Sequence, residues 1–321
     1  MKIIDYILSG ILEEGISHLV TSSSDLLVTI CDETILNKFS ITQICDERST
    51  GYVAIGLYEE IEKPIAIIVE ESEMRNLAPA VTEAYYRKFP LIVISLTDRN
   101  LDNRQYPIDM FKYMYNIAPY SISSDLNIAK SIINSAKTYG GTPILLNMED
   151  YKNDIVYNNK NIDRTSLYNI PYKCERIDDL IKIVKLLDDT NVEFYIDKGC
   201  ICYDLLKLKL KGNIEYNKGV CALEGLLSIM IGASLVARNK HFIYLGTTKS
   251  VIYDINALGN RHISKNITIC LLDKNDDVYL IKQTCRTWKY DLFEESPDTL
   301  HRVSCLIKND SLLNPSIIEI L

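Results

Sequence analysis

Several common kinds of site are missing from this sequence of 321 residues. It has only four histidines, no two of them close together, and no Cys-x-x-Cys pair. A zinc site would therefore have to be assembled from distant residues. No Gly-x-Gly-x-x-Gly follows a strand pattern, and no Gly-x-x-x-x-Gly-Lys-Ser/Thr segment exists. These absences argue against a zinc site, a dinucleotide site and a P-loop.

Long apolar runs and an excess of positive charge are lacking too. No stretch approaches the ~18–20 apolar residues that span a bilayer, and the first residues lack a signal peptide's apolar stretch. With 43 acidic and 35 basic residues, the formal net charge is −8, whereas binding a nucleic-acid backbone requires a basic patch. Nine scattered cysteines favour reduced thiols. We expect a cytoplasmic protein that binds neither a membrane nor a nucleic acid.

What is present is a regular alternation of helix and strand patterns. The strand segments are continuously apolar, as in Ile65-Ala66-Ile67-Ile68. Unbroken apolar strands between helices are typical of a parallel sheet that is covered on both faces. The alternation stops in a segment rich in Asn and Tyr and then begins again. We therefore expect an α/β fold of two doubly wound, mainly parallel-sheet domains, residues 1–150 and 176–321, with a linker at 151–175.

Five segments in collinear order carry more information than any one of them alone. In the first half they are residues 46–56 (DERSTGYVAIG), 76–80 (NLAPA) and 90–94 (PLIVI). In the second half they are residues 217–233 (NKGVCALEGLLSIMIGA) and 254–258 (DINAL). Together they resemble the thiamine-diphosphate (ThDP) enzymes, most closely the menaquinone-pathway SEPHCHC synthases within the acetolactate-synthase-like group.

The resemblance has consequences for domains, cofactor and assembly. It implies a pyrimidine-binding (PYR) domain first and a pyrophosphate-binding (PP) domain second, without the middle domain of longer relatives. It implies ThDP as cofactor. It also implies a reaction on a 2-oxoacid substrate, either decarboxylation or carboligation. Such a cofactor lies between the PYR domain of one subunit and the PP domain of another. We therefore expect a homodimer or a homotetramer that binds a small-molecule ligand.

Glu47 is the residue on which the resemblance depends most. In the family, this glutamate hydrogen-bonds N1′ of the aminopyrimidine and promotes deprotonation of the thiazolium C2, which requires an acid in a dry pocket. Taken alone, the residue is better explained as an acid at a helix start, favoured by the helix dipole, and only the whole DERS-x-G segment favours the cofactor role. Leu223 matches the family's apolar wedge under the cofactor, or is an ordinary core leucine. Asn76 and Gly219 are further candidates for contact with the cofactor.

The metal motif departs from the family. There, a motif that begins Gly-Asp-Gly and ends at an Asn holds Mg²⁺ against the diphosphate through hard oxygen ligands. Here the positions are Gly246-Thr247-Thr248 and Asp273-Lys274, with Thr247 and Lys274 27 residues apart as in the family. We therefore expect no metal. Gly246, Thr247 and Thr248 stay candidates for binding the phosphate end, and Lys274 either pairs with phosphate directly or is a surface lysine.

A second departure is the acidic segment Glu70-Glu71-Ser72-Glu73, where relatives have a Gly/Ser/Thr loop. Its carboxylates would repel the carboxylate of a 2-oxoacid, suit a cationic ligand, or simply form a solvated loop. Two hypotheses stay open. The chain is a ThDP enzyme with a degenerate metal motif, or it is a ThDP-fold protein without catalysis that binds a different ligand or acts as a scaffold or regulatory subunit.

Overall fold

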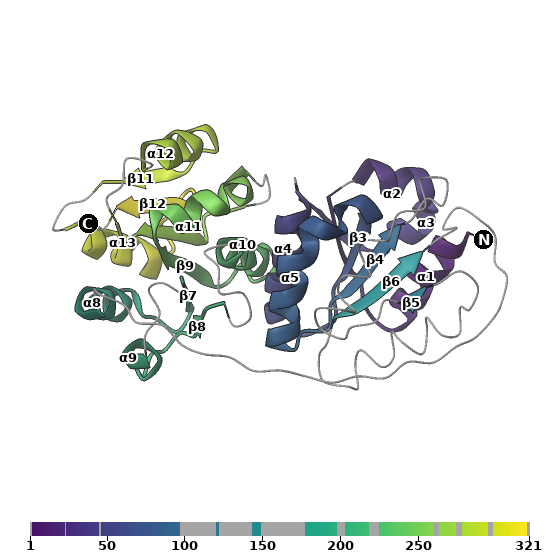
Figure 1. Ribbon diagram of the computed structural model, residues 1–321. Coiled ribbons are helices and arrows are strands. Elements are labelled where there is room, and N and C mark those ends of the chain that lie inside the picture. The colour runs from purple at the N-terminus through teal and green to yellow at the C-terminus, as the bar shows by residue number, and fades with distance from the viewer. Residues whose placement is uncertain are drawn as a thin grey trace. The chain divides into compact units, whose positions relative to one another are not determined.

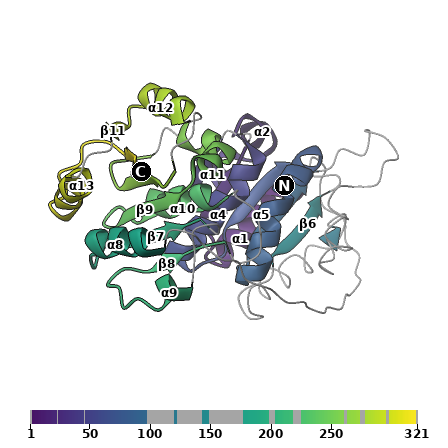
Figure 2. The same ribbon diagram turned by 60° about the vertical axis from the view of Figure 1, so that its left-hand side comes forward.

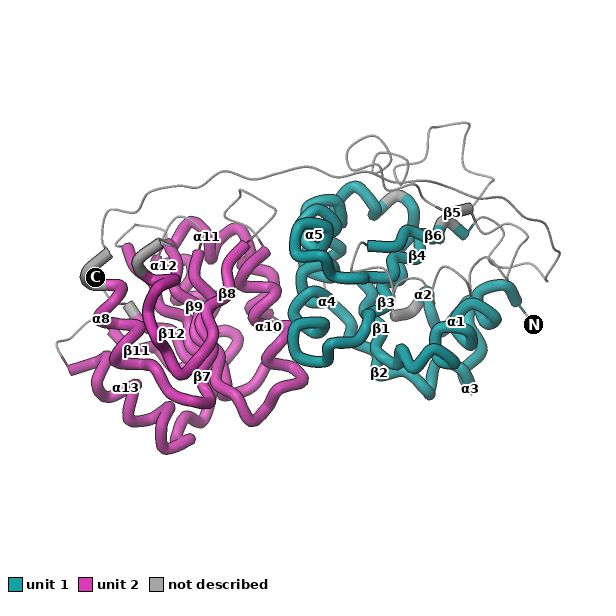
Figure 3. The backbone as a smooth tube through the Cα atoms, turned by 90° about the horizontal axis from the view of Figure 1, so that it is seen from below, with its two compact units in different colours: residues 1–169 teal, residues 170–321 magenta. Residues whose placement is uncertain are grey.

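Figure 1 shows the protein as a computed structural model. The structure describes residues 2–22, 24–44, 46–96, 120–121, 143–148, 177–197, 203–217, 225–259, 263–273, 278–294 and 298–319. The chain divides into two compact units, residues 1–169 and 170–321 (Figure 3). The expected linker at 151–175 lies outside the described residues, as does a helix expected at 126–139. Within the described ranges, no helix is long and apolar enough to cross a membrane.

Six strands form the sheet of the first unit, and every pairing in it is parallel. They are β1 (His18–Thr21), β2 (Ser40–Gln43), β3 (Ala66–Glu70), β4 (Ile92–Leu96), β5 (Tyr120–Ser121) and β6 (Ile144–Met148). Their order across the sheet is β2-β1-β3-β4-β6-β5. The central strand β4 is buried along its whole length, which explains why its sequence is apolar at successive positions.

Helices cover both faces of this sheet. They are α1 (Ile3–Glu13), α2 (Ser24–Ile30), α3 (Glu33–Leu36), α4 (Glu47–Ile61), the 3₁₀ helix η1 (Glu71–Glu73) and α5 (Met74–Arg87). Helices α1, α2 and α3 share one core cluster with alternate residues of β3, β4 and β6. Helices α4 and α5 pack against each other on the opposite side of the sheet (Figure 1).

The second unit repeats this architecture. Its strands are β7 (Val192–Ile196), β8 (Ile214–Glu215), β9 (His241–Gly246), β10 (Ile267–Leu271), β11 (Asp291–Phe293) and β12 (Ser316–Glu319). All pairings are parallel, in the order β8-β7-β9-β10-β12-β11. Counted from the first strand of each unit, this is the order of the first sheet. The predicted fold class, two doubly wound α/β domains with parallel sheets, is confirmed.

The helices of the second unit also lie on both faces of its sheet. They are α8 (Ile177–Leu187), α9 (Tyr203–Leu206), α10 (Leu226–Val236), α11 (Thr248–Tyr253), the 3₁₀ helix η3 (Ile255–Gly259), α12 (Val278–Thr287) and α13 (Thr299–Lys308). Helices α8, α9 and α13 contribute to one core cluster with β7 and β9. Helix α10 also packs against β7 and β9, and Figure 2 shows these elements side by side.

Strand order indicates where a ligand would bind in each unit. The first strand lies between the second and the third, so that β1 is flanked by β2 and β3, and β7 by β8 and β9. At such a switch point the connections leave in opposite directions, and a crevice forms beyond the carboxyl ends of the strands. Helices that follow parallel strands begin at that same edge. The starts of α4, α5, α10 and α11 are therefore the places to search for a site.

Candidate functional site

Glu47 is the first residue of α4, at the carboxyl edge of the first sheet. The preceding residue, Asp46, is the N-cap: its Oδ1 accepts a hydrogen bond from the Ser49 N–H at 2.9 Å. Its carbonyl accepts from the Thr50 hydroxyl at 2.7 Å. This capping fixes the start of the helix and leaves Glu47 half-buried in the first turn, where the helix dipole favours a carboxylate.

Two side chains from η1 and α5 meet Glu47. Asn76 Nδ2 donates a hydrogen bond to Glu47 Oε2 at 3.2 Å, and the carboxyl of Glu73 lies near enough to that of Glu47 for the two to interact electrostatically. The structure thus brings together Glu47 and Asn76, two of the residues that the sequence proposed for cofactor contact. Glu73 was considered only as part of the acidic segment, because no pattern in the sequence shows which side chains η1 and α4 bring together.

The acidic segment is a helical turn rather than a loop. Glu70 and Glu73 form a reciprocal capping box, in which the Glu70 N–H donates to Glu73 Oε2 at 3.0 Å. The Ser22 hydroxyl donates to the same oxygen at 3.1 Å. Burial raises the pKa of Glu73, and the neighbouring Glu47 carboxylate raises it further. Glu73 therefore keeps its proton to a higher pH than an ordinary glutamate.

At the carboxyl edge of the second sheet, β9 ends at Gly246 and α11 begins directly afterwards. Thr247 is the N-cap of α11, because its Oγ1 accepts from the Ser250 N–H at 3.3 Å. A Cβ on Gly246 would lie 2.5 Å from the Tyr244 ring and 2.9 Å from Ser250 Oγ. The Tyr244 hydroxyl in turn donates to Ser250 Oγ at 3.0 Å. The space over this glycine is thus filled by the protein's own side chains.

Asp273 joins the two segments of the altered metal motif. It follows β10, the neighbour of β9, and its Oδ1 accepts from the Thr248 N–H at 2.6 Å and from the Thr248 hydroxyl at 2.8 Å. Thr248 is fully buried and Asp273 half-buried. The motif is therefore held together by a carboxylate that caps α11. The other predicted residues, Leu223, Gly219 and Lys274, lie outside the described residues.

A second carboxylate caps the start of α10. Asp254 is buried, and its Oδ2 accepts from the Gly225 N–H at 2.8 Å and from the Ser228 N–H at 3.3 Å. Both helices that begin at this edge near β9 are consequently capped by carboxylates of the same unit.

The two ends of ThDP fit the described residues differently. At the pyrimidine end, Glu47 is a half-buried acid fixed by a donor and by a second carboxyl, which suits contact with a ring nitrogen. At the phosphate end, Thr247 Oγ1 and Asp273 Oδ1 already accept hydrogen bonds from α11. Nowhere in the described ranges do three or more His, Cys, Asp or Glu side chains gather to hold a metal ion. The described residues at this end do not fit a diphosphate with its Mg²⁺.

A comparison with known families matches the first unit, which contains Glu47. Residues 1–114 match the family described as "Thiamine pyrophosphate enzyme, N-terminal TPP binding domain". The resemblance to ThDP enzymes is confirmed. The match includes Glu47 and Asn76, and it supports thiamine diphosphate as the cofactor.

Curated relatives of the chain are 2-succinyl-5-enolpyruvyl-6-hydroxy-3-cyclohexene-1-carboxylate synthases. That of Cytophaga hutchinsonii is 42% identical over 59 residues, which are 18% of this chain and 11% of that enzyme. That of Christiangramia forsetii is 42% identical over 94 residues, which are 28% of this chain and 16% of that enzyme. The chain therefore matches well under a fifth of the length of these two relatives.

Among solved structures, the chain is similar to an X-ray structure described as a thiamin diphosphate-dependent enzyme from Mycobacterium smegmatis. The TM-score is 0.74, and the likeness covers 100% of this chain and 99% of that one, at 8% sequence identity. This likeness shows that the ThDP-enzyme fold extends over both units.

Proposed function

We propose that this chain binds thiamine diphosphate at Glu47 and acts as a decarboxylase or carboligase on a 2-oxoacid, with a degenerate metal motif. The observation that carries the proposal is the setting of Glu47. It begins α4 at the carboxyl edge of a parallel sheet, accepts a hydrogen bond from Asn76, and interacts with the neighbouring carboxyl of Glu73. The matched family domain includes these same residues.

In this proposal Glu47 exchanges a proton with N1′ of the aminopyrimidine. Asn76 Nδ2 fixes Glu47 Oε2 at 3.2 Å and so orients the carboxylate. Burial and the neighbouring Glu47 raise the pKa of Glu73, and protonation of Glu73 would lower the mutual repulsion of the two carboxyls. Bound ThDP would supply a carbon nucleophile and an electron sink for bond cleavage or formation next to a carbonyl.

The proposal is tested by calorimetric titration of the purified chain with ThDP, and by CO₂ release from a panel of 2-oxoacids. Glu47→Gln is expected to weaken ThDP binding by about tenfold or more and to abolish CO₂ release. The matched control is Glu33→Gln, because Glu33 also follows a capping aspartate at a helix start but is exposed. Equal affinity in the native chain and Glu47→Gln would contradict the proposal.

We also propose that the chain assembles as a homodimer or homotetramer. The resemblance supports this, because sites of this family are completed across subunits. Light scattering at micromolar concentration is expected to give two or four times the mass of the 36.7-kDa chain. A monomeric mass under those conditions would contradict the assembly.

A second candidate function is a scaffold or regulatory subunit without catalysis. The observation in its favour is that Thr248 donates two hydrogen bonds to Asp273 Oδ1. A carboxylate of the altered metal motif therefore caps α11. The two candidates differ in the same experiments: a scaffold releases no CO₂ from any 2-oxoacid, and its ThDP affinity does not depend on Glu47.

A further inference from the structure

Three donor groups just after the end of β9 are already in use. The Thr248 N–H and hydroxyl both donate to Asp273 Oδ1, at 2.6 and 2.8 Å. The Ser250 N–H donates to Thr247 Oγ1 at 3.3 Å. A phosphate group binds at such a place through backbone N–H and hydroxyl donors, so it would have to displace a carboxylate that makes two charge-assisted hydrogen bonds.

The space beside these donors is filled as well. The Tyr244 ring and Ser250 Oγ lie where a Cβ on Gly246 would project, at 2.5 and 2.9 Å. Tyr244 is buried, and its hydroxyl donates to Ser250 Oγ, which itself donates to the Thr247 carbonyl at 2.8 Å. Gly246 therefore serves the packing of Tyr244 against α11, which is a structural reason for a glycine at this position.

Two carboxylates at this edge also oppose a phosphate. Asp273 and Asp254 are the acceptors at the starts of α11 and α10, and Asp254 is buried. A diphosphate brought to this edge would face these carboxylates at short range, where like charges repel. A metal ion would find both Asp273 Oδ1 and Thr247 Oγ1 already accepting hydrogen bonds from α11.

We infer that the described edge at residues 246–250 and Asp273 holds no metal-bound diphosphate, that Asp273 is a structural cap in its place, and that the ligand class of the protein is the thiamine moiety irrespective of phosphorylation. The inference rests on the proposed function for the identity of the ligand. It goes beyond that function in what it says of the diphosphate part of the ligand. Glu47 recognises the pyrimidine, whereas the diphosphate adds nothing to the affinity.

The test compares three probes on the native chain by calorimetry, each with and without Mg²⁺: thiamine, ThDP and inorganic pyrophosphate. Thiamine and ThDP are expected to bind with dissociation constants within about threefold of each other, unaffected by Mg²⁺, and pyrophosphate is expected not to bind. ThDP that binds more than about tenfold tighter than thiamine, and only with Mg²⁺, would overturn the inference.

Two substitutions of Asp273 distinguish a helix cap from a residue that binds the cofactor. Asp273→Ala and the isosteric Asp273→Asn are expected to lower the melting temperature while leaving ThDP affinity unchanged or higher. Asp298→Ala is the control, because Asp298 is an N-cap residue of α13 whose side chain makes no capping hydrogen bond. A loss of Mg²⁺-dependent ThDP affinity in Asp273→Asn, with an unchanged melting temperature, would assign Asp273 to the cofactor instead.

The outcomes distinguish this inference from the proposed function. If neither thiamine nor ThDP binds, the proposed function fails, and the thiamine part of the inference fails with it. Pyrophosphate with Mg²⁺ then decides the part that concerns the second unit: binding contradicts a self-capped edge, and no binding supports it. If thiamine binds through Glu47 and ThDP binds far tighter with Mg²⁺, the proposed function stands and the inference fails.

Discussion

The two units of this chain have the same strand order and the same parallel pairings, but their carboxyl edges are used differently. In the first unit, the start of α4 presents a carboxylate, Glu47, whose partners are the side chains of Asn76 and Glu73. In the second unit, the carboxylates Asp254 and Asp273 accept from the N–H groups of the helix starts themselves. The same topology thus places at one edge a carboxylate with side-chain neighbours, beside the capping Asp46, and at the other edge two carboxylates that both cap helices.

This difference shows that fold alone does not make a site. A carboxylate that caps a helix is satisfied within the protein, while one that is held by neighbouring side chains keeps an acid–base role open. If the two units differ in this way, substitutions in them should differ in their effect on stability.

The largest effect is expected from Arg87→Ala in the first unit. Arg87 Nε donates to Glu83 Oε1 at 2.7 Å, both side chains are fully buried, and Arg87 also pairs with Glu59 across α4 and α5. Removing the cation takes from the buried Glu83 carboxylate its Arg87 partner, which costs about 3–5 kcal/mol of unfolding free energy. Urea denaturation measures this cost.

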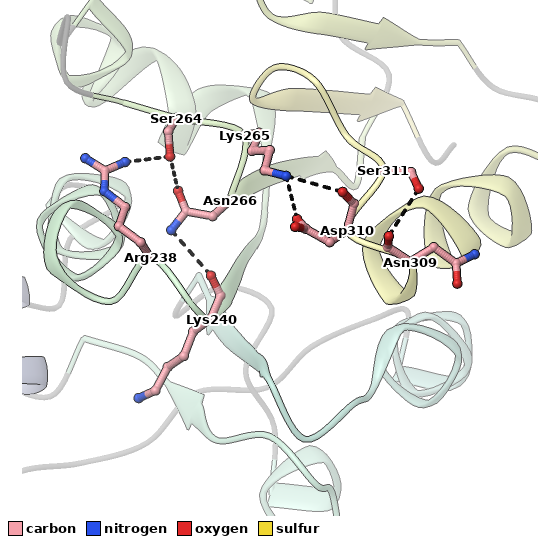
Figure 4. Close-up of polar contacts among 8 residues, drawn as sticks. All are labelled: Arg238, Lys240, Ser264, Lys265, Asn266, Asn309, Asp310 and Ser311. Carbon is pink, nitrogen blue, oxygen red and sulfur yellow. Dashed lines mark hydrogen bonds and ion pairs between the residues drawn. The ribbon is translucent and has the colours of Figure 1, made fainter.

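The control for Arg87 is an exposed ion pair of the second unit, Lys265 with Asp310, whose Nζ and Oδ1 atoms lie 2.8 Å apart (Figure 4). Lys265→Ala is expected to change the unfolding free energy by less than about 1 kcal/mol, because solvent screens such pairs. Equal costs for the two substitutions would contradict the difference in burial on which the prediction depends.

The next effect is a pH dependence that arises in the second unit. Burial lowers the pKa of His241 to about 4. The nearby charge of Asp310 raises this pKa, but by less than burial lowers it. His241 Nε2 is hydrogen-bonded to Thr268 Oγ1 at 2.8 Å. Below pH 6.5 the unfolded chain takes up a proton that the folded chain does not, so stability falls between about pH 6.5 and pH 4, by at most about 1.4 kcal/mol per pH unit.

Urea denaturation at several pH values measures this loss. In His241→Asn the contribution is absent, and the difference between the native chain and the variant should shrink as the pH falls through this window. Parallel pH profiles for the two proteins would show that His241 is not the group responsible.

A smaller effect is expected from the helix caps of the second unit. Asp254→Ala leaves the Gly225 and Ser228 N–H groups of α10 without their acceptor in a buried setting, at a cost of about 2 kcal/mol. Asp298→Ala, at the start of α13, should cost less than about 0.5 kcal/mol, because Asp298 makes no capping hydrogen bond. Thermal unfolding of both variants checks the order of these costs.

The smallest effect is expected from Glu73→Gln in the first unit. A carboxyl whose folded pKa is raised loses stability as the pH rises through that pKa, because the ionised form is the less favourable one in the fold. Glutamine cannot ionise and still accepts from the Ser22 hydroxyl, so the melting temperature at neutral pH should rise slightly. A lower melting temperature would mean that Glu73 stabilises the fold as a carboxylate.

Sequence patterns predicted those elements whose periodicity is strong. The apolar patterns predict strands at 64–69, 91–96 and 267–272 and helices at 48–60 and 225–237. The corresponding elements β3, β4, β10, α4 and α10 lie within one or two residues of these bounds. Helices α12 and α13 were not predicted, because each has only two or three buried positions among polar ones. The 3₁₀ helix η1 was read as a loop, since its capping box consists of the same glutamates that indicated a solvated segment.

Only those site residues that belong to a recognisable motif could be predicted from the sequence. Glu47 and Asn76 belong to matched segments, and the structure adds their contact. The role of Asp273 was not predictable, because its acceptor position depends on the register of β9 and β10 and on the turn into α11. Glu73 was missed for the same reason: the contact between η1 and α4 is a tertiary one.

The most direct test of the difference between the two edges is amide hydrogen exchange of the intact chain, measured by mass spectrometry with and without ThDP. The account predicts that ThDP slows exchange in residues 46–50 and 74–77, around Glu47 and Asn76. It predicts no change in residues 247–251, where Asp273 already holds the Thr248 N–H. Slower exchange in residues 247–251, without a change around Glu47, would contradict the account.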